Sequence, residues 1–247
     1  MAEKTTFQHQ VDSAIPALLS IHDVMPETVD KVLAIIARLR EAEVTAITLL
    51  VVPGRKWSAA QLARLHTVNE GADIQLAGHG WVHECTRIRG LKHRLHSLLF
   101  SRKVAEHLAL ARGDIPAFIQ RNFDWFEGHF FPAPQLYVPP AWAMGRISTR
   151  QLADLPFRYY ETLREVYDSE TGVRHRTPIV GYEADAFHRK VAVRIWNGRN
   201  VRAVTATAPL RISIHPGDFE LLLANDIMTH IEQVTAWWFY SDLGHKE

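Results

Sequence analysis

The chain has 247 residues, of which 47% are hydrophobic and 22% are charged. This composition is typical of a globular protein and excludes a disordered or fibrous chain. The formal net charge is +1, so there is no global electrostatic reason to expect nucleic acid or an anionic membrane as a partner.

The single cysteine, Cys85, excludes an intrachain disulfide and is compatible with a reducing compartment. The opening residues MAEKTTFQHQ contain no apolar run of signal-peptide length, and the apolar stretch ITLLVV is too short to span a bilayer. We therefore expect a cytoplasmic protein without a membrane partner. The sequence leaves the oligomeric state open.

Predicted strands and helices alternate along the first part of the chain. Short apolar runs predict strands at 16–24, 46–53 and 73–79. Between them, apolar residues recur at helical spacing over 27–42 and 58–71, which predicts two helices. Such βα units form a parallel sheet, and in these folds the chemistry gathers at the carboxyl ends of the strands.

The rest of the chain has a less regular pattern. Residues 85–134 read as a helical insertion, whose aromatic-rich half would either pack on the barrel or cover its rim as a lid. Residues 157–209 read as several short strands, including an alternating stretch at 189–198 that ends in an Asn-Gly turn. Residues 218–240 are predicted as one long helix. Without a repeat or an obvious linker, we expect one domain over the whole chain.

Polar residues follow the predicted strands where their carboxyl ends would meet. His22 and Asp23 end the first strand, His79 ends the third, and His215 ends a late strand. On a helix, His79 and His83 would lie on one face with Cβ atoms roughly 6 Å apart, close enough to share a metal ion. Two imidazoles and one carboxylate are a common ligand set of a catalytic divalent ion.

Four motifs occur in an order that resembles a known enzyme family. They are SIHD (20–23), HGWVH (79–83), YVPPAW (137–142) and ISIHP (212–216). Together they resemble the polysaccharide deacetylase superfamily, the NodB-homology or carbohydrate esterase family 4 group, and most closely a divergent intracellular branch with an His-Asp-Val opening and an Ile-His-Pro close. The resemblance implies an α/β fold, a distorted (β/α) barrel of about seven strands, and metal-dependent hydrolysis of an amide bond.

The resemblance also implies roles for individual residues. Asp23, His79 and His83 would bind a divalent metal ion, most simply zinc, although iron, cobalt and nickel suit the same ligands. His215 would be the general acid that protonates the leaving amine, a role that suits an imidazole titrating near pH 7. The alternative for His215 is a structural role before the turn at Pro216.

The chain departs from the family pattern at the general base. At the position of the family's aspartate base, this chain has His22. The arginine that pairs with that aspartate in the family is replaced by Tyr137. We find no aspartate-rich fourth motif. These losses are linked and indicate a rewired base. We predict His22 as the base, with Glu84 and Glu161 as alternatives. Helical geometry argues against Glu84, because a residue next to a ligand points about 100° away around the helix.

The third motif predicts a wall of the substrate site, formed by Tyr137, Pro139, Pro140 and Trp142, with the indole stacking on a sugar face or buried. Trp81 is a weaker candidate for the same wall. The predicted function is hydrolysis of non-peptide carbon–nitrogen bonds, with deacetylation of a small N-acylated, amino-sugar-containing substrate. The alternatives are a non-catalytic carbohydrate-binding descendant and a (β/α) metallohydrolase that acts on esters or phosphoesters.

Overall fold

The structure is a computed structural model that describes residues 15–82, 107 and 113–245. Its elements, in chain order, are β1 (Pro16–Val24), α1 (Val29–Glu41), β2 (Ile47–Val51), α2 (Ala59–Asn69), β3 (Ile74–Gly78), α4 (Asp114–Gly128), β4 (Leu136–Tyr137), η2 (Pro140–Trp142), α5 (Thr149–Ala153), β5 (Tyr159–Glu161), β6 (Glu165–Asp168), β7 (Arg174–Arg176), β8 (Ile179–Val180), α6 (Phe187–Val201), β9 (Leu210–Ile214), η3 (Asp218–Glu220), α7 (Ala224–Glu232), β10 (Ala236–Trp238) and η4 (Tyr240–Asp242).

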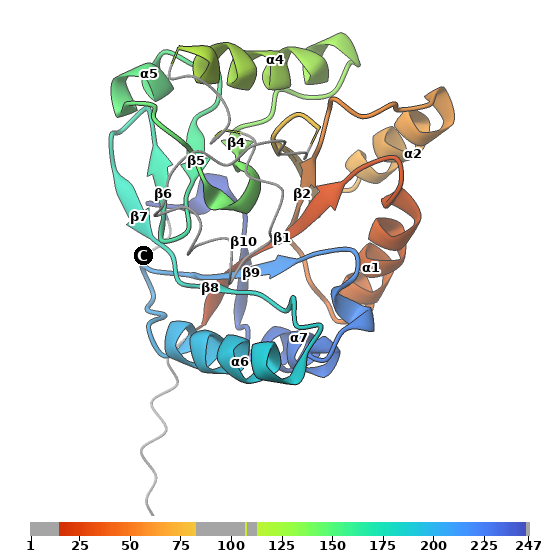
Figure 1. Ribbon diagram of the computed structural model, residues 1–247, viewed down its shortest axis with the longest axis vertical. Helices are drawn as coiled ribbons and strands as arrows, with labels where there is room; N and C mark the ends of the chain where they lie inside the picture. Colours follow the sequence, from red (N-terminus) through yellow and green to blue (C-terminus); the bar gives the residue numbers. More distant parts are fainter. Residues whose placement is uncertain (1–14, 83–106, 108–112, 246–247) are drawn as a thin grey trace, which may run out of the picture.

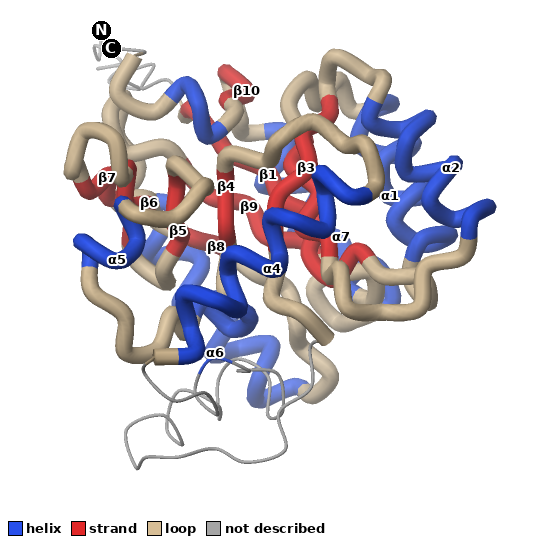
Figure 2. Tube along the Cα trace, turned by 90° about the horizontal axis from the view of Figure 1, so that it is seen from above, coloured by secondary structure: helices blue, strands red, loops and turns tan. Residues whose placement is uncertain are grey.

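The described strands form one curled sheet with helices around its outside (Figure 1). The strand order is β7-β6-β5-β4-β3-β2-β1-β9-β8, and β10 pairs with the start of β1. Seen from above, α1 and α2 lie together at one side of the strands and α4 lies across another (Figure 2). The predicted (β/α) barrel class is confirmed, although the described part of the chain contains ten strands where about seven were expected.

The centre of the sheet is parallel. β1 runs parallel to β2 and β9, and β2, β3, β4 and β5 continue the parallel pairing. Antiparallel pairing is found at β5–β6 and β6–β7, where a meander forms one side of the barrel. The carboxyl ends of β1, β3, β4 and β9 therefore meet at one rim, as the βα pattern of the sequence predicts.

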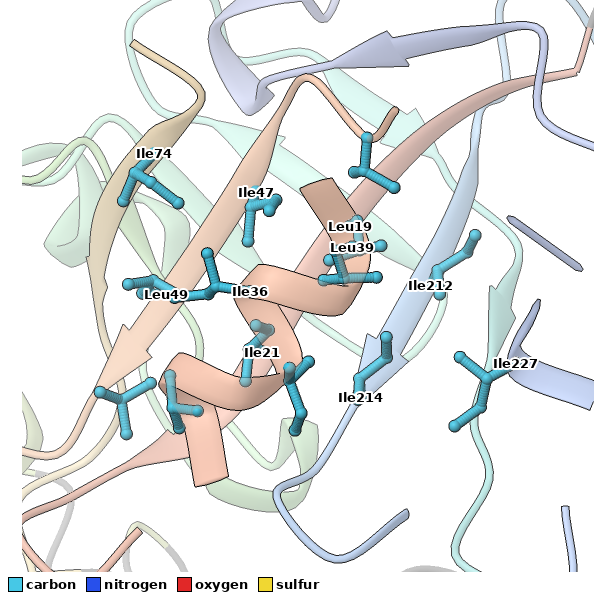
Figure 3. Close-up of a cluster of buried hydrophobic side chains, with 14 of the residues drawn as sticks. Leu19, Ile21, Ile36, Leu39, Ile47, Leu49, Ile74, Ile212, Ile214 and Ile227 are labelled. Atoms are coloured by element: carbon cyan, nitrogen blue, oxygen red, sulfur yellow. The ribbon is translucent and has the colours of Figure 1, made fainter. Parts of the chain in front are cut away.

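Side chains alternate between the two faces of each strand, and this alternation decides which residues reach the barrel interior. On the outer face, Leu19 and Ile21 of β1 pack with Ile36 of α1 and Ile212 of β9 in the main hydrophobic core (Figure 3). On the inner face, Leu18 belongs to a second buried cluster. Ser20 and His22 continue this inner row, so the strand carries His22 into the barrel at its carboxyl end.

The prediction of strands for 189–198 is wrong, because these residues belong to helix α6. Two side chains of α6 anchor it to the strand beside it: Trp196 donates its indole N–H to the Ile179 carbonyl oxygen at 3.2 Å, and the Asn197 amide bonds both backbone groups of Gly181. Val191 and Ile195 are exposed on the same helix. The alternating apolar residues of this segment are therefore not the buried face of a strand.

The final segment also differs from the prediction of one long helix. Helix α7 covers only Ala224–Glu232, and Ala236–Trp238 forms β10. Thr235 begins this return to the sheet: its backbone N–H donates to the Ile15 carbonyl oxygen at 3.0 Å, and its hydroxyl accepts from the Ile15 N–H at 2.8 Å. The β-branched Thr235 suits the extended backbone at that point.

The aromatic-rich segment forms α4, which packs on the barrel. Ile119, Phe123 and Phe126 are buried on the face of α4 that points to the sheet, whereas Phe130 beyond its end is 91% exposed. The described part of the predicted insertion therefore has the packing role. None of the helices in the described ranges combines the length and the apolar character needed to cross a bilayer.

Candidate active site

Strand β1 ends in an irregular turn that carries Asp23 to the rim. The register between β1 and β2 shifts after Ile21, and Asp23 has a left-handed backbone with φ of 52°. Few residues other than glycine adopt this conformation, and aspartate is among those that tolerate it. Thr28 fixes the turn, because its hydroxyl donates to the Asp23 carbonyl oxygen at 2.5 Å and accepts from the Met25 N–H at 3.0 Å.

His79 follows β3 and is held through both its backbone and its ring. The backbone N–H donates to the Val51 carbonyl oxygen at 2.9 Å, which extends the parallel ladder beyond the strand. The ring Nδ1 lies 2.8 Å from the Val138 carbonyl oxygen. Since a carbonyl oxygen only accepts, Nδ1 carries the proton, and in the neutral ring Nε2 presents its lone pair to the rim. Metal-binding histidines are commonly oriented by such a bond.

Asp23 and His79 fit two positions of one metal site. Asp23 Oδ1 lies 3.4 Å from His79 Nε2. Two atoms bound to one tetrahedral zinc, each at about 2.0–2.1 Å, are separated by about 3.4 Å. The third predicted ligand, His83, lies outside the described residues. Within the described ranges no group of three or more histidine, cysteine, aspartate or glutamate side chains could hold a metal ion.

His22 lies at the centre of the rim. Its side chain is buried, and its ring centroid is 5.0 Å from that of His79, 4.7 Å from that of His215 and 5.3 Å from that of Trp142. The ring Nε2 hydrogen-bonds to the Ser20 hydroxyl at 3.1 Å.

His215 follows β9 and is surrounded by acidic groups. Asp218, which is completely buried, accepts a hydrogen bond from the His215 backbone N–H at 2.8 Å, and the same oxygen lies 3.6 Å from the ring Nδ1. Burial lowers the pKa of His215, but Glu183, Asp218 and Asp23 together outweigh it and raise the pKa to about 10. The ring is therefore protonated at neutral pH. Asp218 and Glu183 were not singled out from the sequence.

The structure does not bring Tyr137 into this site, in contrast to its predicted role in the substrate wall. Tyr137 is completely buried on the outer face of β4, where it packs with Ile115 and Phe157. Its hydroxyl lies 2.6 Å from Nε2 of His107, whose pKa burial lowers to about 4. Its Nδ1 donates to the Met144 carbonyl oxygen at 3.1 Å, so the neutral His107 ring accepts a hydrogen bond from the Tyr137 hydroxyl at Nε2. The outward direction follows from strand alternation, since Leu136 and Val138 point inward.

Of the other predicted wall residues, Trp142 reaches the site, whereas Pro139 and Pro140 are buried. Trp142 is partly exposed and has a left-handed backbone with φ of 53°. Its indole N–H donates to Glu161 Oε1 at 2.6 Å, which fixes the ring beside the histidines. Trp81 instead stacks with the Arg121 guanidinium, which lies 3.9 Å from its ring centroid.

A buried ion pair lies behind Trp142. Arg211 Nη1 is 2.7 Å from Glu161 Oε1, and both side chains are 1% exposed. Glu161 also accepts a hydrogen bond from the Tyr240 hydroxyl. With both oxygens engaged, Glu161 orients Trp142 and is not placed to act as the alternative base. Arg211 was not predicted as part of the site, although an arginine inside the apolar run LRISI is a signal that a buried anion faces it.

No family model matches the sequence, and no curated protein matches it. A crystal structure described as a putative polysaccharide deacetylase from Mycobacterium smegmatis matches 92% of this chain and 87% of its own, with a TM-score of 0.56 and 14% sequence identity.

The chain has the polysaccharide deacetylase fold. A family 4 carbohydrate esterase from Streptomyces lividans, in complex with acetate, is a more distant match: the TM-score is 0.42 and the identity 14%, over 91% of this chain and 92% of that one. At such identities the likeness concerns the fold. The chemistry of this polysaccharide deacetylase-like chain therefore has to be argued from its own rim residues.

Proposed function

We propose that the protein is a metal-dependent hydrolase of non-peptide amide bonds that removes the acyl group from a small N-acylated substrate, with acetylated amino sugars as the first class to test. The observation that carries this proposal is the 3.4 Å separation of Asp23 Oδ1 and His79 Nε2 at the rim, beside the cationic His215. The polysaccharide deacetylase fold is consistent with it.

Asp23, His79 and His83 would hold the ion in this proposal. A divalent ion at this position would lower the pKa of bound water and polarise the substrate carbonyl. The bond from His79 Nδ1 to the Val138 carbonyl oxygen keeps the ring oriented with Nε2 toward Asp23. The left-handed backbone of Asp23 is fixed by the Thr28 hydroxyl, and the Asp23 carboxylate lies 3.4 Å from His79 Nε2, so both side chains are preorganised.

Two histidines would move the protons. His22, between His79 and His215, takes up a proton from the attacking water. His215 donates a proton to the leaving nitrogen, and the buried Asp218 and the nearby Glu183 favour the charged form of its ring. Trp142 supplies an apolar wall for the bound substrate.

Replacing His215 tests this assignment. In zinc-loaded protein we expect His215→Ala to lower kcat for acetate release by about 10²- to 10⁴-fold, because general acid catalysis typically contributes this much. Elemental analysis should find the same metal content as in the wild type. His188→Ala, at an exposed histidine of α6, is the matched control and should leave both quantities unchanged.

The metal assignment is tested separately with Asp23→Asn, which keeps the shape of the side chain and tolerates the left-handed backbone. This variant should lose bound zinc. A wild-type protein that binds none of zinc, cobalt, nickel and iron would contradict the proposal. Full metal content with hydrolysis of esters but of no amide would favour the ester alternative, and full metal content without any turnover would favour the binding alternative.

A further inference from the structure

A cavity of about 160 Å³ opens beside His215, between helix α6 and the strand edge formed by β8 and β9. Its wall is mainly apolar and includes Ile179, Val193 and Trp196. Ile195, at 55% exposure, also lines it, so the cavity reaches the surface. An engineered apolar cavity of ~150 Å³ binds benzene, so this volume is that of one aromatic ring.

The cavity and the proposed catalytic rim share two side chains, His215 and Trp142. A ligand group in the cavity would therefore contact the ring that is proposed to protonate the leaving nitrogen. A substituent within a few bonds of the scissile amide could enter it while the amide stays at the rim. The cavity is thus continuous with the candidate active site.

A buried polar atom indicates that the cavity receives a ligand. Ser213 lines it, is 1% exposed, and its hydroxyl has no hydrogen-bond partner among the described residues. Buried hydroxyl groups are nearly always hydrogen-bonded in native proteins. A polar group of a substrate that enters beside His215 would supply the missing partner.

The walls are held in place from both sides. The Asn197 side chain of α6 bonds the N–H and the carbonyl oxygen of Gly181, at 3.2 and 2.8 Å, and the Trp196 indole bonds the Ile179 carbonyl oxygen. A Cβ atom added to Gly181 would meet no atom within 4 Å. Because Gly181 also lines the cavity, a larger side chain there is expected to occupy the open space without a clash.

We infer that the substrate carries a ring-sized apolar group, aromatic or branched aliphatic, close to the scissile amide. This inference rests on the proposed function, and it narrows the substrate class to apolar N-acyl compounds instead of bare acetylated sugars. The group could be attached to the nitrogen or to the carbonyl carbon, and the experiment has to distinguish these two positions.

Direct binding of three amides tests the inference. N-Benzylacetamide and N-methyl-2-phenylacetamide are isomers with the ring on the nitrogen side and on the acyl side, and N-methylacetamide lacks the ring. We expect one of the isomers to bind at least about ten-fold more tightly than N-methylacetamide, because a buried phenyl ring removes a large apolar area from water. Shifts of the tryptophan indole N–H signals in NMR titrations measure this, since Trp142 and Trp196 line the cavity.

Two blocking variants locate the bound ring. Gly181→Leu and Ala192→Phe fill the cavity from opposite walls, and either should abolish the ten-fold preference. Gly128→Leu is the matched control, because a Cβ there also meets no atom within 4 Å and Gly128 ends α4, away from the cavity. Equal affinity for all three amides, or a preference that survives both blocking variants, would overturn the inference.

Failure of the proposed function would give a different result from failure of this inference. In that case the ring-bearing amide still binds, and the blocking variants still remove its binding, but zinc-loaded protein releases no amine from it. Conversely, turnover of acetylated sugars without any preference for ring-bearing amides would keep the proposed function and reject the apolar cavity as a substrate site.

Discussion

At the scale of single residues, the charge state of His215 is the most informative feature of the rim. Its ring is partly buried, and burial by itself would favour the neutral form. Three carboxylates reverse this effect, and the buried Asp218 also fixes the backbone of His215. A proton donor that stays charged over the neutral range is useful only if the leaving group is basic, as an amine is.

The raised pKa of His215 predicts a pH dependence of stability. In the unfolded chain histidine has a pKa of about 6.5, whereas folding raises the pKa of His215 to about 10. The folded state therefore holds the proton more tightly, so this stabilisation is fully present below about pH 6.5 and is lost as the pH rises through about 10. In metal-free protein, urea unfolding should show a wild-type advantage over His215→Gln that shrinks by more than about 1.4 kcal/mol between pH 6.5 and 10.

The control for this measurement is His188→Gln. Because His188 is exposed, the free energy of unfolding of this variant should match that of the wild type at each pH. An advantage of the wild type over His215→Gln that stays constant between pH 6.5 and 10 would show that the carboxylates do not hold the ring in its charged form.

The residues at the rim could be predicted from the sequence better than the residues that hold them in place. His22, Asp23, His79 and His215 could be found because each ends a parallel strand, and parallel strands have a common carboxyl edge. Asp218 and Glu161 act through contacts in an irregular turn or between distant segments, which local periodicity does not encode. Tyr137 was assigned to the rim from its motif, but strand alternation turns it to the outer face.

At the scale of elements, the contact between β3 and α4 positions the loop that carries His79. Asn122 of α4 is completely buried and donates a hydrogen bond to the Gly80 carbonyl oxygen. Gly78, the last residue of β3, allows this approach, because a Cβ atom there would overlap the Asn122 side chain. The glycine before His79 thus has a packing role.

Gly78→Ala is therefore expected to destabilise the protein by about 1–3 kcal/mol, the usual cost of overpacking, and to weaken zinc binding through displacement of His79. Urea unfolding and zinc titration measure the two effects. Gly128→Ala, where the added Cβ meets no atom within 4 Å, is the matched control and should be close to neutral. A Gly78→Ala variant with wild-type stability would show that α4 does not constrain the loop.

The elements themselves were predictable where their hydrophobic period was clear. β1, α1, β2, α2 and β3 lie within a few residues of their predicted positions. Helix α6 was missed because its outer residues alternate by chance, and the contacts that hold it, from Trp196 and Asn197 to the backbone of the β8 segment, are tertiary. Tertiary contacts outweigh a weak local pattern in such a case.

At the scale of the whole molecule, Arg211 connects opposite sides of the curled sheet. From β9 its guanidinium donates to the carbonyl oxygens of Thr162 at 2.9 Å, Leu163 at 2.8 Å and Thr177 at 3.1 Å, besides its ion pair with Glu161. These acceptors lie in the turn after β5 and in the segment between β7 and β8. The side chain, which is 1% exposed, therefore links β9 with the antiparallel side of the barrel.

Replacing Arg211 should lower the free energy of unfolding, and the size of this loss depends on whether Glu161 keeps its charge. Arg211→Met leaves Glu161 buried without its cation, and breaking a buried ion pair costs about 3–5 kcal/mol. The double variant Arg211→Met, Glu161→Gln removes the uncompensated charge and should regain part of that loss. Urea unfolding of the two single variants and the double variant closes the cycle. Additive losses would show that the two charges do not interact, and the loss in Arg211→Met would then come from its carbonyl contacts and its packing.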